Sequence, residues 1–279
     1  MRLIGFLFLM ACAGAASAQD AGPPAPRPMQ PERPDLRPEQ AAAPQEPPAA
    51  AALPAPPPGL STTPPLGYSP TDPAEPAPQQ PLAPPIHQAL REDDFTFSAC
   101  LLDLSLMGAD YIVEAPLTDP EHRDCGIDRP IMLRAPLPGV QINGGALMRC
   151  ETAWHLAHWL RDSVRPALSM LPGQPRLSGI QPGSTYQCRV TVGDKGENLS
   201  EHAFGNAFDV SALTFSDGSQ FVIEPRDGKG DMAEAVQAAI RGAACLHFTT
   251  VLGPGANAAH DDHLHLDIKA RDSGWRLCQ

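Results

Sequence analysis

The chain gathers metal-binding residue types near its C-terminus. The segment HDDHLHLD, residues 260–267, holds three histidines and three aspartates in eight positions. Side chains alternate between the two faces of a strand, so His263, His265 and Asp267 should point the same way while the leucines between them point into a core. Neutral imidazole is the commonest metal ligand, and a ligating histidine usually needs a carboxylate or carbonyl behind it to fix its tautomer. The segment therefore predicts part of a metal site.

A second segment, SEHAFGNAFDV at residues 200–210, offers the remaining ligands. His202 should lie in a loop and Asp209 in the strand that follows, with Gly205 leaving room for close backbone approach between them. Four of the nine histidines of the chain fall in these two segments. A catalytic zinc site typically takes three protein ligands and leaves a fourth position open, and the two segments together predict such a site.

Both segments resemble known motifs. Residues 200–209 match the S-x-H-x-x-G-x-A-x-D motif of zinc D-Ala-D-Ala peptidases, and residues 260–265 fit H-x-x-H-x-H, which resembles the penicillin-insensitive murein endopeptidases of the lysostaphin-type group. The region from Cys100 to Cys278 looks like the bacterial extensin-like C-terminal domain, a family similar to the same zinc peptidases.

The resemblance implies a role for each residue of the two motifs. Zinc would be held by His202, Asp209 and His265. His263 would act as general base or transition-state stabiliser, and His260 would help to position it. Related peptidases carry an arginine upstream of the first motif, which makes Arg189 the candidate for stabilising the oxyanion.

One position departs from the carboxypeptidase branch of that group. Where that branch has a glutamate before its last ligand, this chain has Asp262, one methylene shorter, so the base is either His263 or Asp262. This departure favours an endopeptidase. We therefore expect a periplasmic, zinc-dependent peptidoglycan hydrolase that cuts a peptide bond in the murein stem or cross-link. The alternative is a wall-binding or structural module that keeps the fold without turnover.

The N-terminal residues are typical of a secretory signal peptide. An apolar run follows Arg2 and ends at a small-residue site, which predicts a signal peptide over residues 1–18. A rival interpretation takes Leu9 to Cys12 as a lipobox that leaves Cys12 lipidated. No other apolar run approaches the roughly 18 residues that a membrane span needs.

Cysteine usage agrees with export, and the net charge bears on the class of partner. Six cysteines remain beside Cys12, and an even number in an oxidising compartment predicts three disulfides, whose pairing the sequence leaves open. The net charge of −12, without a lysine and arginine cluster, argues against a nucleic-acid partner. Oligomeric state stays open.

Composition divides the chain into a linker and one folded region. Residues 19–92 form a Pro- and Ala-rich segment, and 23 of the 34 prolines lie before about residue 90, so we expect an extended, disordered linker. Residues 93–279 should form the extensin-like, zinc peptidase-type domain. We expect an α+β fold in which a small antiparallel sheet carries the zinc site, flanked by helices and stabilised by disulfides.

Hydrophobic periodicity places the elements of this domain. Apolar spacings of three and four predict a long helix over 145–171, kinked near Pro166, and shorter helices over 99–111 and 231–248. A hairpin is expected over 206–225, with further strands over 247–253 and 263–268. His155 and His158 lie on the long helix without a third ligand, so we interpret them as part of a helix surface.

Overall fold

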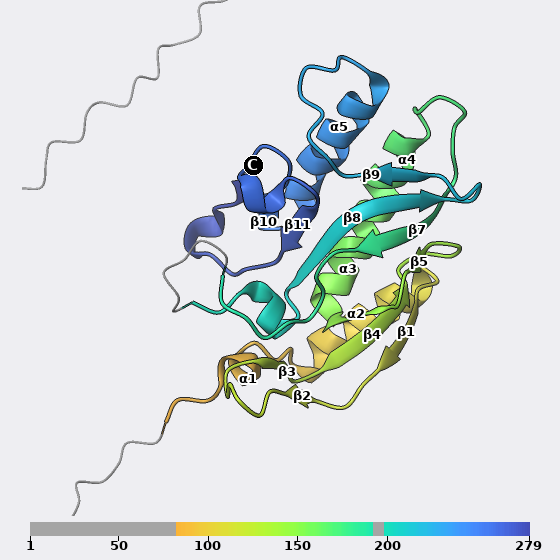
Figure 1. Ribbon diagram of the computed structural model, residues 1–279. Helices are drawn as coiled ribbons and strands as arrows, with labels where there is room; N and C mark the ends of the chain where they lie inside the picture. The colour runs from red at the N-terminus through yellow and green to blue at the C-terminus, as the bar shows by residue number, and fades with distance from the viewer. Residues whose placement is uncertain (1–81, 192–197) are drawn as a thin grey trace, which may run out of the picture. The chain divides into compact units, whose positions relative to one another are not determined.

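The computed structural model describes residues 82–191 and 198–279 (Figure 1). All of these residues belong to one compact unit, Glu75–Gln279. The expected signal peptide at residues 1–18, the possible lipid anchor at Cys12 and the expected linker as far as residue 81 lie outside the described residues. Among the helices that are described, none has the length and apolar character needed to cross a bilayer.

Helices and strands alternate along the described chain. The helical elements are α1 (Ile86–Ala89), α2 (Asp94–Leu106), α3 (Cys150–Trp159), the π-helical turn η1 (Leu160–Val164), α4 (Arg165–Leu168), α5 (Met232–His247) and three short 3-10 turns, η2 (Glu201–Phe204), η3 (Ala258–His260) and η4 (Asp272–Gly274). The strands are β1 (Asp110–Val113), β2 (Leu117–Thr118), β3 (Gly126–Ile127), β4 (Pro130–Ala135), β5 (Gln141–Ile142), β6 (Ala146–Arg149), β7 (Leu177–Pro182), β8 (Ala207–Phe215), β9 (Gln220–Val222), β10 (Thr250–Leu252), β11 (Leu264–Asp267) and β12 (Leu277–Cys278).

The largest sheet carries the two motif segments. Its strand order is β12-β10-β11-β8-β7-β5, with β9 paired to β8. The central pairings are antiparallel, whereas β5 and β12 join the two edges in parallel. A second sheet has the order β1-β4-β6, and β2 pairs with β3. The mixed α and β character agrees with the expected α+β class.

The core lies where α3 packs behind the largest sheet (Figure 1). The apolar stripe predicted for the long helix is buried there from Cys150 to Leu168. The α-helical pattern breaks at η1, directly before Pro166. Proline has no N–H for the carbonyl four residues earlier and its ring crowds that carbonyl, which accounts for a wider turn at this place.

Several parts of the element prediction were wrong. The helix predicted over 145–171 begins only at Cys150, because Ala146–Arg149 forms β6. No strand was predicted between the helices over 99–111 and 145–171, yet β1 to β6 lie there, between α2 and α3. Most of these strands contain only two to four residues, too few for an alternating pattern to stand out. The linker boundary at residue 92 is also wrong, since α1 precedes it and Glu92 is 7% exposed. The buried Glu92 carboxylate accepts a hydrogen bond from Arg149 Nε at 3.1 Å, which ties this segment to the domain.

The expected three disulfides are present. Cys100 in α2 is bonded to Cys150 in α3, and Cys125 is bonded to Cys188. The third disulfide joins Cys245 in α5 to Cys278 in β12 and so fixes the last strand beside β10. Each bond links segments at least 33 residues apart, a span over which a crosslink restricts the unfolded chain strongly.

His155 and His158 are half-buried on α3 beside Trp154, so they lie less open to solvent than the expected helix surface. The ring of His155 lies 4.8 Å from that of Trp154 and 5.9 Å from that of Phe248, and burial lowers its pKa to about 4, with help from the nearby charge of His247. His158 Nε2 lies 2.8 Å from Asp103 Oδ2, which joins α3 to α2. The sequence gives no sign of the neighbours that cover this side of the helix.

The half-buried His155 predicts a specific loss of stability in acid. The pKa of His155 in the folded chain lies below the unfolded value near 6.5, so the unfolded chain binds the proton more readily. The stability that this histidine contributes above about pH 6.5 is therefore lost as the pH falls towards 4. Between pH 7 and pH 5, we expect the unfolding free energy of the wild type to fall by about 1–2 kcal/mol more than that of His155→Phe, measured by urea denaturation. His122→Phe, at an exposed histidine, is the matched control. Equal losses in all three proteins would contradict this account.

Candidate functional site

Strand pairing brings the two motif segments together. β11 lies antiparallel to β8, and the register sets His265 directly opposite Asp209. His202 lies in η2, the turn that precedes β8. The apolar side chains that alternate with the polar ones, Leu264 and Leu266, are fully buried, as the alternation along the strand predicts.

The donor atoms of these three residues form a nearly regular triangle. His202 Nε2 lies 3.2 Å from Asp209 Oδ1 and 3.2 Å from His265 Nδ1, and the third side, from His265 Nδ1 to Asp209 Oδ1, measures 2.9 Å. Ligands bound at 2.0–2.1 Å in a tetrahedron are separated by about 3.3 Å. Among the described residues, these three form the one group of histidine, cysteine and carboxylate side chains placed to share a metal ion.

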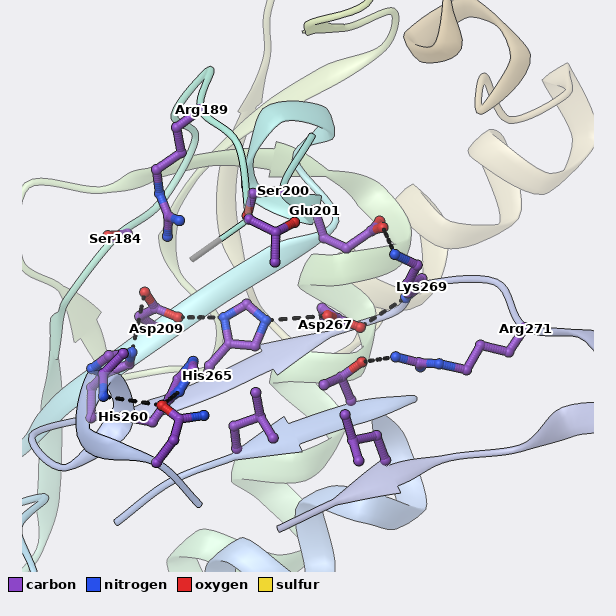
Figure 2. A pocket seen from close by; sticks show the side chains of 17 residues that line it. Ser184, Arg189, Ser200, Glu201, Asp209, His260, His265, Asp267, Lys269 and Arg271 are labelled. Carbon is purple, nitrogen blue, oxygen red and sulfur yellow. Dashed lines mark hydrogen bonds and ion pairs between the residues drawn. The ribbon is translucent and has the colours of Figure 1, made fainter. Parts of the chain in front are cut away.

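Both imidazoles are oriented from behind. His202 Nδ1 lies 2.6 Å from the carbonyl oxygen of Thr185. His265 Nε2 lies 3.2 Å from Asp267 Oδ2 (Figure 2). A proton on each of these outer nitrogens leaves the inner nitrogen as an acceptor that faces the centre of the triangle. This is the support that metal-ligating histidines typically receive.

The surroundings of the triangle stabilise positive charge. Burial lowers the pKa of His265, but its hydrogen bonds to Asp209 and Asp267 outweigh burial and raise the pKa to about 9. Burial raises the pKa of Asp209, but hydrogen bonds with His202 and His265 outweigh it and hold the pKa well below its usual range. Without a metal, the proton on His265 is the cation between two buried carboxylates, a position that suits a divalent ion.

Two glycines allow the close approach of the segments around the site. Gly205 ends η2 in the left-handed region at φ 67°, and a Cβ there would lie 2.4 Å from Ile127 Cδ1. At Gly183 a Cβ would lie 3.0 Å from Asp209 Cβ. Gly205 thus allows a close approach, but to Ile127 and the backbone of Arg149, which the sequence did not indicate. Ser200 caps η2 by accepting a hydrogen bond from the backbone nitrogen of His202.

A buried polar network supports the turn that carries His202. Arg149 Nη1 donates to Asn206 Oδ1 at 2.8 Å, and Asn206 Nδ2 donates to Glu201 Oε2 at 2.8 Å. The same guanidinium donates to Glu92, so the segment before α2 contributes to the geometry of the site. Asn206 stands between the motif positions, where sequence reasoning gave it no role.

His263 lies beside the triangle and Asp262 behind it. His263 Nε2 lies 3.7 Å from Asp209 Oδ2, while His263 Nδ1 lies 2.8 Å from Asp262 Oδ1. The side chain of Asp262 is 91% exposed and that of His263 is 18% exposed. Of the two candidate bases, His263 is therefore the one whose nitrogen faces the site, and Asp262 orients it.

His260 and Arg189 complete the predicted set. The ring of His260 lies 5.3 Å from that of His263, and its Nδ1 lies 2.7 Å from Asn257 Oδ1. Burial lowers the pKa of His260, as do the nearby charges of His265 and His263. Arg189 extends from its loop towards the side of the site on which Asp209 lies (Figure 2). Its Nε donates to Gln187 Oε1 at 3.1 Å.

Five of the residues predicted from the sequence line one cleft of about 280 Å³: Arg189, Asp209, His260, His263 and His265. His202 and Asp262 do not line it. Sequence reasoning missed the far wall of this cleft, which is formed partly by Lys269 and Arg271. It also missed Thr185, which acts through its backbone carbonyl and leaves no side-chain signal. Asp267 could have been assigned as the partner of His265, because the two stand two residues apart on one strand face.

A comparison with protein families bears on the whole folded region. The family described as Extensin-like protein C-terminus matches residues 98–279, a range that includes both motif segments and all six cysteines of the disulfides. Searches of curated proteins and of solved structures gave no match. Because the matched range covers more than half of the chain, this protein belongs to the extensin-like protein C-terminus family.

Proposed function

We propose that this chain is a periplasmic, zinc-dependent peptidoglycan hydrolase that cuts a peptide bond in the murein stem or cross-link. The observation that carries the proposal is the triangle of His202 Nε2, Asp209 Oδ1 and His265 Nδ1, with sides of 2.9–3.2 Å. An endopeptidase is favoured over a D-Ala-D-Ala carboxypeptidase because Asp262 replaces the glutamate of the carboxypeptidase motif.

The donor set suits zinc. Two imidazoles and one carboxylate are the ligands of several catalytic zinc sites, in which water or substrate takes the fourth position. When bound, zinc supplies Lewis-acid polarisation of the scissile carbonyl and makes water a nucleophile near neutral pH. The triangle borders the cleft through Asp209 and His265, so a peptide bond can reach it from solvent.

His263 is suited to move the proton. Its Nε2 faces the site and accepts the proton of the attacking water, then donates it to the leaving amine, while Asp262 holds the Nδ1 side of the ring. His263 and Asp262 thus form a general base whose ring is oriented by a carboxylate. His260 borders this ring and restricts its position, and Arg189 provides positive charge for the oxyanion.

Three features support export and a cell-wall substrate. The first 18 residues are typical of a signal peptide, and three disulfides suit an oxidising compartment. The motif at residues 200–209 resembles that of peptidases that act next to D-amino acids. The proposed substrate is therefore peptidoglycan.

The first test measures the metal. We expect the purified full chain to contain about one zinc per molecule, and we expect His202→Ala and Asp209→Ala to lose it, because each removes one of three ligands. His122→Ala, at an exposed histidine outside the site, is the matched control and should keep its zinc. Elemental analysis that finds equal zinc in all four proteins would remove the ligand assignment.

The second test concerns the carboxylate behind His265. Asp267→Asn keeps the shape of the side chain but removes its charge, and we expect zinc affinity to fall about 10- to 100-fold in a chelator competition. Circular dichroism of the variant should match that of the wild type, which would separate a weakened site from a misfolded one. An unchanged affinity would mean that Asp267 does not support the metal.

The third test assigns the base. We expect His263→Ala to retain zinc and to lose murein hydrolysis about 10²- to 10⁴-fold, because proton transfer contributes a factor of that size. Asp262→Asn should lose less, since it only orients the ring. Mass spectrometry of the released muropeptides measures both rates. Full activity in His263→Ala together with inactivity in Asp262→Asn would make Asp262 the base.

A further inference from the structure

Arg271 is held firmly at the wall of the cleft that sequence reasoning missed. Its Nη1 donates to the carbonyl oxygen of Thr249 at 3.0 Å, and its Nη2 donates to Thr250 Oγ1 at 2.6 Å. The guanidinium carbon lies 5.3 Å from the centre of the Trp275 ring. These contacts fix the plane of the guanidinium, while its remaining N–H groups stay available.

Within the part of the chain that the structure describes, the charge of Arg271 lacks an acidic partner. Its neighbour Lys269 forms an ion pair with Glu201, with Nζ 3.5 Å from Oε1. Among residues 82–191 and 198–279, no carboxylate forms an ion pair with Arg271. The nearby Asp267 carboxylate is directed to His265 instead, at 3.2 Å. An oriented guanidinium without a counter-charge is a site for an anion.

Arg271 and the triangle belong to the same cleft. In Figure 2, Arg271 and Arg189 approach from opposite sides of the view, and His265 lies between them. A ligand that reaches the triangle can therefore extend along the cleft to Arg271. The chain as a whole has a net charge of −12, so this local positive charge would draw an acidic group to one end of the cleft against the general field.

We propose that Arg271 binds a carboxylate of the peptide substrate and that the cleft therefore selects acidic peptides. The inference rests on the proposed function and adds a specificity-determining residue to it. A planar guanidinium matches a carboxylate with two parallel hydrogen bonds, a geometry that lysine cannot provide. A carboxamide in the same place would offer one acceptor and no charge, so the cleft should discriminate between free and amidated peptide carboxylates.

The experiment compares two forms of one substrate. Isolated murein is used either with its free peptide carboxylates or after carbodiimide coupling to ammonia, which converts them to amides. We expect the zinc-loaded full chain to have a KM about 10- to 100-fold lower for the free form, because a charge-assisted hydrogen-bond pair contributes a factor of that size. Arg271→Gln should raise the KM for free murein to that for amidated murein and leave the latter unchanged.

Three comparisons make the result specific. If Arg271→Gln slowed hydrolysis of both substrates equally and kept the wild-type preference for free murein, the proposal would be contradicted. Arg271→Lys keeps the charge but not the planar fork and should restore part of the preference. Arg134→Gln removes an exposed arginine from β4, outside the cleft, and should behave as the wild type. Equal hydrolysis of both mureins by the wild type would overturn the carboxylate site and leave the hydrolase standing.

A binding measurement separates the two proposals. Soluble muropeptides, released from both mureins by a separate muramidase, are titrated into the full chain by calorimetry, with wild type and Arg271→Gln compared. If murein is not cut but the wild type binds the free peptides more tightly than the amidated ones, and Arg271→Gln does not, the carboxylate site holds and the hydrolase fails. If the wild type binds both peptide forms equally, the carboxylate site fails whatever the activity.

Discussion

The pairing of β11 with β8 is the constraint on which the site depends. Its register sets His265 opposite Asp209, and a slip by one residue would turn His265 into the core and bring Leu264 or Leu266 to the cleft. The fully buried leucines prevent this slip, because exposing them on the side of the sheet that borders the cleft would cost several kcal/mol of hydrophobic burial. Burial of these leucines therefore determines which side chains of β11 face the cleft.

The same strand concentrates negative charge in a buried place. Asp209 and Asp267 lie on either side of the His265 ring, at 2.9 and 3.2 Å from its two nitrogens. Two buried carboxylates are tolerated only with compensating positive charge. A proton on His265 provides that charge in the chain alone, and in our proposal zinc provides it in the working protein. The positive charge of Arg189 and Arg271 at the two sides of the cleft extends this pattern to the substrate.

The sequence predicted the parts of the site that depend on local spacing. Alternation predicted the common face of His263 and His265, and the long helix, α5 and the β8–β9 hairpin all followed from periodicity. What it missed depends on contacts between distant segments. The Thr185 carbonyl behind His202, the partners of Arg271 and the cover over His155 are set by tertiary packing, and the short strands before α3 carry no readable period.

Anomalous diffraction at the zinc absorption edge, from crystals of the purified protein, tests the central claim most directly. The account predicts one strong peak just above the plane of the triangle, with His202 Nε2, His265 Nδ1 and Asp209 Oδ1 each about 2.0–2.2 Å from it. A zinc peak elsewhere, or crystals grown with excess zinc that show no peak between these three atoms, would contradict it.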